Sequence, residues 1–480
     1  MSPLHPFTTT SSKATSKPLN KLFLALVALA AATLLATGCS SAVDSGASGG
    51  VTGPAFVVGT DAPLPSVTSF AVQLISVDAV TAGGTSVPLI SGSPTVDFAR
   101  FNGLQTLLDM NDVTAGTYTS INVTLGPATI GYLNTPSGAA PTVATEAATY
   151  TTTSQTPTIT IALASPLIVT QGEPVGLHFD FDLSKSIQVS NGAITGMVTP
   201  TFDLAAVNIG DAGGYIDQFD AAVVSVDVAT QSFVVEGPHG RQFTINVNGS
   251  TEWDNNESIS SLTTSSVVRV SGKLDKADST IDADEVAILT QNSFYADGQV
   301  TYVTPSTGAA TSFDLYVRAL LPTNTGLTLG QIAQVNLTGS EKFFIYQMHN
   351  PLTQFLFNSS GLLPGQDVVV GGPASGAASA SAVTVNRISL HHWGYNGTVV
   401  PGSINTGAGT FQLQVTGFAG VLVPETVTVY TSTVTNFRGG LTSNSSLSNN
   451  ENVRVVGVLL KNPFVSGQAI LLAHYVDELP

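Results

Sequence analysis

Apolar and polar residues alternate along several segments between residues 54 and 209. The clearest examples are residues 67–77, 121–125, 158–164 and 175–183. Alternation of this kind is typical of strands with one buried face, and no segment shows the sustained 3.6-residue period of a long helix. We therefore expect residues 54–209 to form an antiparallel β-sandwich domain. Within it, Asp97 and Phe98 open an irregular segment, and residues 104–110 are expected to form a helical turn.

Residues 214–478 repeat one pattern three times, in copies at 214–290, 298–390 and 394–478. Each copy opens on a glycine and continues with a strand that a phenylalanine leads. An aromatic residue follows (Trp253, Phe344 and Phe437), and a Val-rich run and a final strand close the copy. Five or six short strands in such a length predict a small barrel, because closure removes exposed sheet edges. The predicted fold class is all-β, a sandwich followed by three barrel repeats.

The N-terminus has the pattern of an export signal. Lys13, Lys17 and Lys21 precede an apolar run at residues 22–35. This run of 14 residues is shorter than the roughly 20 that span a bilayer, and it fits a signal-peptide core. Residues 39–53 are mostly small or polar, as in a flexible tether.

Residues 35–39 (LATGC) resemble a bacterial lipobox. The resemblance implies cleavage before Cys39 and acylation of its thiol and new amine, which would anchor the chain to a membrane. Ser40 after the cysteine implies sorting to the outer membrane. The alternative is a plain secretory signal with an incidental cysteine.

The net charge of the chain limits the classes of partner that it is expected to bind. The net charge is −17, and residues 1–38 contain three lysines and no acidic residue, so their removal leaves −20. A body this acidic repels phosphate backbones, and nucleic acid is therefore not an expected partner. Cys39 is the only cysteine, which excludes an intramolecular disulfide.

Five motifs stand in an order that resembles the bacterial domain-of-unknown-function family 4382. They are TDAP (60–63), VDF (96–98), AGTY (115–118), FDFDLS (179–184) and TPTF (199–202). The resemblance implies a β-sandwich of bacterial envelope proteins and no established activity. The strand order of the C-terminal copies resembles the domain-of-unknown-function family 5666, which implies small OB-like barrels.

One strand carries a candidate metal site. Along residues 177–183 the apolar residues would enter the core, and His178, Asp180 and Asp182 would line the other face. One imidazole and two carboxylates favour a hard divalent ion such as calcium. The alternative, which we prefer, is a solvated sheet face, because a metal site needs more converging ligands than one strand offers. Otherwise no cofactor is expected.

Catalytic motifs are absent from the sequence. Outside the tether it contains no G-x-S-x-G elbow, and the whole sequence has no H-E-x-x-H pair, P-loop or dinucleotide-binding glycine motif. The adjacent histidines His391 and His392 would face opposite ways on a strand, so they cannot easily chelate one ion. The sequence therefore favours a non-enzymatic envelope lipoprotein.

Three roles for such a protein stay open. The first is binding or adhesion, in which an extended array of modules presents loops to a glycan or protein ligand. The second is a structural or assembly role within the envelope. The third is an enzyme acting on polysaccharide, for which His178, Asp180 and Asp182 form the only grouped candidates.

Overall fold

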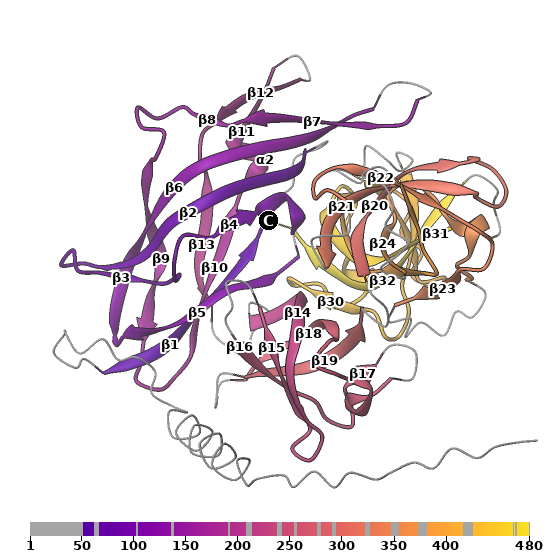
Figure 1. The fold of residues 1–480 in the computed structure, drawn as a ribbon. Coiled ribbons are helices and arrows are strands. Elements are labelled where there is room, and N and C mark those ends of the chain that lie inside the picture. Colours follow the sequence, from indigo (N-terminus) through magenta and orange to yellow (C-terminus); the bar gives the residue numbers. More distant parts are fainter. Residues whose placement is uncertain are drawn as a thin grey trace, which may run out of the picture. The chain divides into compact units, whose positions relative to one another are not determined.

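The computed structural model describes most of residues 51–479, and Figure 1 shows it coloured along the chain. By their contacts residues 51–480 form one unit, which is described here by itself. The predicted signal, Cys39 and the tether up to residue 50 lie outside the described residues. So do the stretches 62–66, 102–103, 136–138, 191–192, 208–213, 238–241, 254–256, 276–279, 290–293, 322–326, 347–354, 373–381, 416–425, 464 and 466–467.

Residues 52–207 form a sandwich of two main sheets around one apolar core (Figure 1). The first sheet has the order β13-β10-β1-β5, and the second has the order β3-β2-β6-β7, with β4 beside β2 and β9 beside β6. A small third sheet has the order β11-β12-β8. The bounds are β1 (Thr52–Thr60), β2 (Val67–Thr81), β3 (Ser86–Pro88), β4 (Thr95–Asp97), β5 (Thr106–Thr114), β6 (Gly116–Asn134), β7 (Thr142–Ala147), β8 (Thr149–Tyr150), β9 (Thr158–Val169), β10 (Val175–Phe181), β11 (Ile187–Ser190), β12 (Ala193–Val198) and β13 (Phe202–Val207).

The predicted sandwich is confirmed, and its pairing is antiparallel except at β1–β10 and β8–β12. Alternation along β10 explains its core. Leu177, Phe179 and Phe181 are buried, whereas His178 and Asp180 between them are half-buried. Phe181 packs on Phe98 with ring centroids 5.3 Å apart. Such aromatic pairs contribute about 0.5–1.5 kcal/mol beyond area burial, so Phe98 fixes the segment after β4 to the core.

That segment differs from its prediction. The helical turn lies at η1 (Phe98–Arg100), and the turn expected at 104–110 is wrong because residues 106–114 form β5 against β1. Leu107 and Leu108 are both buried on opposite faces of β5, in two different apolar clusters. A strand buried on both faces reads as a continuous apolar run, which periodicity cannot distinguish from a helix.

Residues 214–478 form three barrels with the same strand pairing. In barrels 1 and 3 the first strand pairs with the second and the fourth, the second with the third, and the fourth with the last, and the third lies parallel to the last. Barrel 2 has the same pairs, except that two separate strands take the place of the last one. A short extra strand lies parallel to the last strand. The strands are β14 (Tyr215–Asp227), β15 (Ser232–Glu236), β16 (Gln242–Asn246), β17 (Glu252–Trp253), β18 (Val267–Leu274) and β19 (Ile281–Ile288) in barrel 1; β20 (Phe294–Thr304), β21 (Ser312–Leu321), β22 (Ile332–Asn336), β23 (Lys342–Ile345), β24 (Asp367–Gly372), β25 (Ala382–Thr384) and β26 (Arg387–His391) in barrel 2; and β27 (Trp393–Val399), β28 (Thr410–Val415), β29 (Thr426–Tyr430), β30 (Asn436–Arg438), β31 (Asn452–Lys461) and β32 (Ala469–Glu478) in barrel 3.

The prediction of barrel repeats is confirmed. Trp253, Phe344 and Phe437 all lie in the short parallel strands β17, β23 and β30, so the aromatic marker of the sequence corresponds to one structural position. Barrels 1 and 3 close through β16–β19 and β29–β32. In barrel 2 the last strand is divided, and β25 pairs with β22 while β26 pairs with β24.

The sandwich and the barrels share apolar clusters. Phe56, Val58 and Leu107 of the sandwich belong to the core of barrel 1, and Leu104 belongs to that of barrel 3. Other clusters join barrel 1 to barrel 2 and barrel 2 to barrel 3. The extended array expected from the sequence is therefore wrong, because the faces between modules are buried against one another.

Polar contacts join the same modules. Asp217 of barrel 1 accepts from the Gln105 amide at 2.8 Å and from Tyr475 Oη of barrel 3 at 3.0 Å. The hydroxyl of Tyr316 in barrel 2 donates to the Thr68 carbonyl of the sandwich at 3.1 Å. These contacts connect residues more than 100 positions apart in the sequence.

Candidate ligand-binding cavity

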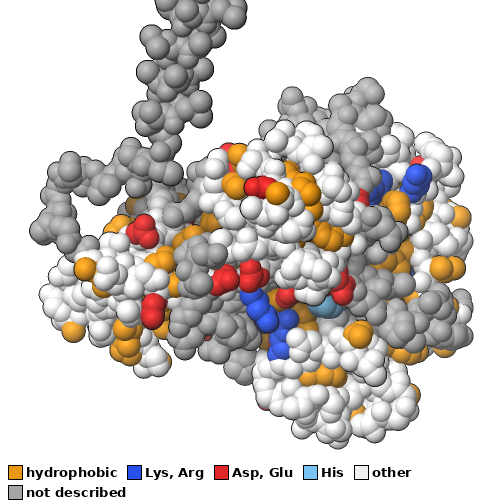
Figure 2. Space-filling view, turned by 90° about the horizontal axis from the view of Figure 1, so that it is seen from below, with side chains coloured by type: hydrophobic (Ala, Val, Ile, Leu, Met, Phe, Trp, Pro, Cys, Tyr) orange, Lys and Arg blue, Asp and Glu red, His pale blue; other side chains and the backbone are white. Residues whose placement is uncertain are grey.

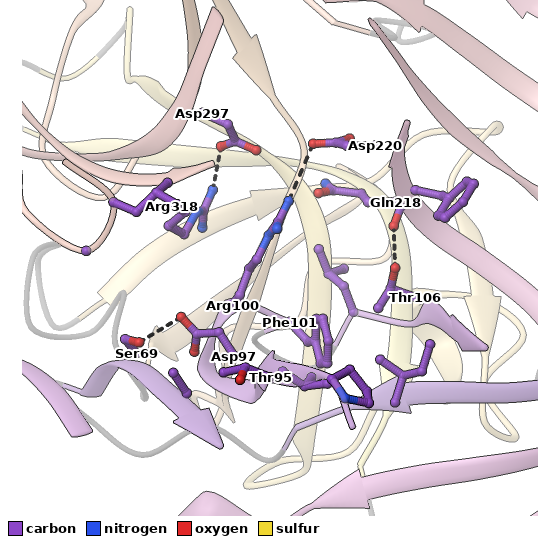
Figure 3. A pocket seen from close by; sticks show the side chains of 18 of the residues that line it. Ser69, Thr95, Asp97, Arg100, Phe101, Thr106, Gln218, Asp220, Asp297 and Arg318 are labelled. Atoms are coloured by element: carbon purple, nitrogen blue, oxygen red, sulfur yellow. Dashed lines mark hydrogen bonds and ion pairs between the residues drawn. The ribbon is translucent and has the colours of Figure 1, made fainter. Parts of the chain in front are cut away.

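A cavity of about 510 Å³ lies where the sandwich meets barrels 1 and 2 (Figure 3). Its volume is in the range of small-molecule sites, roughly 300–1,000 Å³. Apolar and aromatic side chains form much of the wall, and five charged residues also line it. The charged residues are Asp97, Arg100, Asp220, Asp297 and Arg318.

Four segments position these residues. Asp97 ends β4, and Arg100 and Phe101 follow in and after η1, which Phe98 holds in the sandwich core. In Figure 3 Arg100 extends from this segment toward Asp220. Asp220 lies on β14, and Asp297 and Arg318 lie on the paired strands β20 and β21.

A β-bulge next to Asp297 changes the local direction of strand β20. The register between β20 and β21 shifts between Asp297 and Gly298. A Cβ at Gly298 would lie 1.9 Å from the carbonyl oxygen of Tyr316, so only glycine fits at this position. Bulges of this kind commonly redirect a side chain next to a functional site.

Behind the cavity, Arg269 is the centre of a buried ionic network. Its Nε and Nη2 atoms donate to the two Asp220 oxygens at 2.7 and 2.8 Å, and Nη2 also pairs with Asp297. Tyr295 Oη donates to Asp220 Oδ2 at 3.0 Å. Arg269 Nη1 lies 3.2 Å from Nδ1 of His391. The side chain of Arg269 is only 1% exposed, so these partners replace its hydration shell.

The network sets the protonation states of its members. Burial raises the pKa of Asp297, but Arg269 and Arg318 outweigh this effect and hold the pKa below its usual range. Burial and the charge of Arg269 hold the pKa of His391 well below its usual value. We therefore assign an ionised Asp297 and a neutral His391 whose Nδ1 accepts from Arg269 at neutral pH.

Every carboxylate that lines the cavity accepts hydrogen bonds or forms ion pairs within the protein. Asp220 accepts from Arg269 and Tyr295, and Asp297 pairs with Arg269 and Arg318. Asp97 accepts from Ser69 Oγ and from the Phe70 amide, both at 2.7 Å. Burial raises the pKa of Asp97 although these two hydrogen bonds lower it.

Donors at the cavity are not all engaged. Arg318 donates through Nη2 to Asp297 at 3.0 Å and pairs with Asp367, and its guanidinium lies 3.6 Å from the ring centroid of Trp393. Among the described residues, neither Nη1 of Arg318 nor Nε1 of Trp393 has a hydrogen-bond partner, although both atoms are buried. Arg100 is 40% exposed and reaches Asp220 only at 3.7 Å.

The predicted metal site has a different arrangement from the one expected. His178 and Asp180 lie on β10, but Asp182 lies beyond the strand and caps the short helix α2 (Leu183–Ser186). Its carboxylate accepts from the Lys185 amide at 2.9 Å and pairs with Lys185 Nζ at 2.6 Å. Burial lowers the pKa of His178. No group of three or more His, Cys, Asp or Glu side chains within the described part of the chain could hold a metal ion.

Sequence reasoning missed the charged residues of the cavity. The available signal was a charged residue inside an otherwise apolar strand, as with Arg269 in residues 267–270 (VVRV). A charge at such a position is rarely buried without a partner. The sequence did not indicate which partners Arg269 has, because they come from β14, β20 and β26.

Figure 2 shows one face of the surface, on which charged side chains are sparse. One group of basic side chains lies near its centre among acidic ones and beside a histidine. No helix in the described segments is both long enough and apolar enough to cross a membrane.

Two family models match the chain. Residues 55–198 match "Domain of unknown function (DUF4382)", and residues 214–287 match "Domain of unknown function (DUF5666)". The two matches cover the sandwich and barrel 1, and they confirm both resemblances that the motifs indicated. No curated protein matches the chain. The chain thus contains one segment similar to DUF4382 and one similar to DUF5666, and two further barrels of similar topology follow them.

Proposed function

We propose that this protein is a lipid-anchored binding protein of the bacterial cell envelope, which takes a small ligand in the cavity between its sandwich and barrels 1 and 2. The observation that carries the proposal is the cavity itself. It combines a volume of about 510 Å³, a largely apolar wall and a few convergent polar groups, which together characterise ligand sites.

The N-terminal sequence supports anchoring in the cell envelope. Three lysines, an apolar run and a lipobox-like LATGC segment precede a tether of small residues. A triacylated cysteine gives durable attachment, whereas a single acyl chain binds a membrane only marginally. The tether would keep the folded unit away from the lipid surface.

The state of the cavity's carboxylates supports binding rather than catalysis. A general acid or base needs a carboxyl group within reach of a substrate proton. Asp97, Asp220 and Asp297 instead have their oxygens engaged by donors of the protein. This arrangement orients the wall of a binding site and leaves little acid–base capacity.

The proposed lipid anchoring is tested by intact-mass measurement and membrane fractionation of the full chain produced in a bacterial host. We expect the wild-type protein to sediment with membranes and to begin at an acylated Cys39. The Cys39→Ala variant should lose the acyl mass and leave the membrane fraction. An unacylated wild-type chain would remove the anchoring part of the proposal.

The cavity is tested separately by native mass spectrometry of the full chain isolated from bacterial membranes. Leu329 lines the cavity and is 51% exposed, so Leu329→Trp should narrow the cavity without disturbing a core. Ile168 is 59% exposed and does not line the cavity, which makes Ile168→Trp a matched control. We expect a co-isolated small molecule in the wild type and the control and its loss in Leu329→Trp. Absence of any bound molecule in all three would favour the structural role.

A further inference from the structure

We propose that the cavity selects an amphipathic small molecule that carries a carboxylate, which Arg100 and Arg318 bind while an apolar body fills the rest of the space. This inference rests on the proposed binding function and names the chemistry of its ligand. It follows from the unequal state of the donors and acceptors that line the cavity.

The donors provide the attraction for an anion. Arg318 is 5% exposed and lines the cavity, yet its Nη1 has no partner among the described residues. The buried Nε1 of Trp393, on the residue under the same guanidinium, is also without a partner there. A buried donor without an acceptor is unfavourable because it has lost its hydration, and a ligand oxygen would remove that cost. Burial lowers the pKa of Arg318, but a guanidinium stays protonated at neutral pH.

Arg100 adds a second cation at the same wall. Its Nη2 lies 3.7 Å from an Asp220 oxygen that already accepts from Arg269 and Tyr295. An exposed ion pair at this distance contributes little, so Arg100 can turn to a ligand carboxylate at small cost. Guanidinium groups bind carboxylates through two parallel hydrogen bonds, which fixes the orientation of the ligand.

A cationic ligand has no free carboxylate to bind. Among the described residues that line the cavity, the buried acceptor without a hydrogen-bond partner is the neutral side-chain oxygen of Gln105. The oxygens of Asp220 and Asp297 are held by Arg269, Arg318 and Tyr295. Asp97 is held by Ser69 and Phe70, and burial raises its pKa. An ammonium group would therefore have to displace an internal donor before it could bind.

The remaining wall requires an apolar body. Ile90, Phe101, Leu107, Leu108 and Val317 line the cavity beside Trp393. Burial of an apolar group against such a wall is favourable because it removes apolar surface from water. A sugar would leave its hydroxyl groups without partners along this side, which disfavours a glycan, one of the ligands that the sequence analysis left open.

The test is isothermal titration calorimetry of the full chain with three probes. 1-Naphthylacetate has an aromatic body with a carboxylate, and decanoate has an aliphatic body with the same group. 1-Naphthylacetamide has the shape of the first probe without its charge. We expect both carboxylates to bind and the amide to bind at least about tenfold more weakly, because hydrogen bonds between a guanidinium and a carboxylate are stronger than those to a neutral group.

Two variants locate the binding. Arg100→Gln, at a half-exposed position, should weaken 1-naphthylacetate about tenfold and leave the amide unchanged. Leu329→Glu places a negative charge at the cavity and should also weaken the carboxylate, whereas Ile168→Glu, away from the cavity, should not. Far-ultraviolet circular dichroism checks that each variant keeps the fold.

The outcomes separate the two proposals. Equal affinity for the amide and the carboxylate, with both lost in Leu329→Trp, would overturn the anion inference and leave the binding function standing. Carboxylate binding that neither Arg100→Gln nor Leu329→Glu weakens would also overturn it. Failure of every probe, together with no co-isolated molecule in native mass spectrometry, would overturn both.

Discussion

Arg269 shows how a single buried charge depends on residues from distant parts of the chain. Its guanidinium meets Asp220, Asp297 and His391, and the side chain is almost completely buried. Removal of one member of a buried pair leaves the others desolvated and uncompensated, which is more costly than the net contribution of the pair. A substitution at one residue of the network should therefore change the free energy of unfolding measurably.

We expect Arg269→Met to lower the free energy of unfolding by about 3–5 kcal/mol, because Asp220 and Asp297 would lose their shared cation. Lys185→Met is the matched control, since Lys185 pairs with Asp182 but is 72% exposed. That variant should cost less than about 1 kcal/mol. Denaturant unfolding followed by circular dichroism measures both changes. Equal losses in the two variants would contradict the importance assigned to burial.

In contrast to Arg269, whose removal should destabilise the protein, Asp61 itself should lower the stability of the protein at neutral pH. Asp61 is 2% exposed, and a hydrogen bond with the Leu183 backbone only partly offsets the burial of its carboxyl group. Burial and the charge of Asp180 raise the pKa of Asp61 well above its usual value. Because the folded state holds this proton more tightly than the unfolded chain, Asp61 lowers stability as pH rises from the ordinary Asp range through the raised pKa.

Asp61→Asn should therefore stabilise the protein at neutral pH by about 1–3 kcal/mol, since Asn is neutral in both states, whereas the carboxyl group ionises freely only in the unfolded chain. The advantage should shrink as pH falls toward the ordinary Asp range, where the wild-type carboxyl is protonated in both states. Denaturant unfolding of both proteins at several pH values measures this difference. An advantage that stays constant with pH would contradict the assignment.

At the scale of elements, bulges in the barrels are built around glycines, on the fourth strand of barrels 1 and 3 (Gly272 and Gly457) and on the first strand of barrel 2 (Gly298). A Cβ at Gly272, Gly298 or Gly457 would lie within about 2.2 Å of a backbone oxygen on the neighbouring strand. The register shifts at all three sites. Gly298 is the glycine that opens the second copy in the sequence, and at this position the requirement for glycine has a steric cause.

Gly298→Ala should destabilise the protein by roughly 1–3 kcal/mol, because the added methyl group would collide with the Tyr316 carbonyl. Gly249→Ala is the control, since a Cβ there meets nothing within 4 Å. Thermal unfolding of the two variants provides the comparison. The shift of Asp297 in Gly298→Ala should also weaken 1-naphthylacetate, whereas Gly249→Ala should bind it as the wild type does.

At the scale of the whole molecule, the sandwich and the barrels stabilise one another. Phe56 is 1% exposed and lies on β1 of the sandwich, yet it packs in the cluster of barrel 1. The first sheet is therefore buried on both faces. Loss of a contact on its outer face should destabilise barrel 1 as well as the sandwich.

We expect Phe56→Ala to increase amide hydrogen exchange in β14, β18 and β19 as well as in β1. Replacement of a buried phenylalanine by alanine costs about 3–5 kcal/mol, and here that cost falls on a shared cluster. Phe181→Ala removes the same atoms from the sandwich core, whose cluster contains no barrel 1 residue. Its effect on exchange should be confined to the sandwich. Unchanged exchange of barrel 1 in Phe56→Ala would indicate independent modules.

The sequence by itself determined the fold class, the sandwich and the repetition of the barrels. Alternation with a period of two places Leu177, Phe179 and Phe181 on one face whatever their partners are. Local pattern failed at residues 104–110, where burial on both faces of β5 removes the alternation. It also placed Asp182 on a strand face, whereas its side chain ends the strand by capping α2.

Only the tertiary structure decided the candidate site. Arg100, Asp220, Asp297 and Arg318 come from three modules and have no common spacing in the sequence. Their contacts depend on which module faces are buried together, and that choice is made by apolar clusters spread over the whole chain. Strand periodicity is a local property of a few residues, whereas a cavity between modules depends on packing between segments that are distant in sequence.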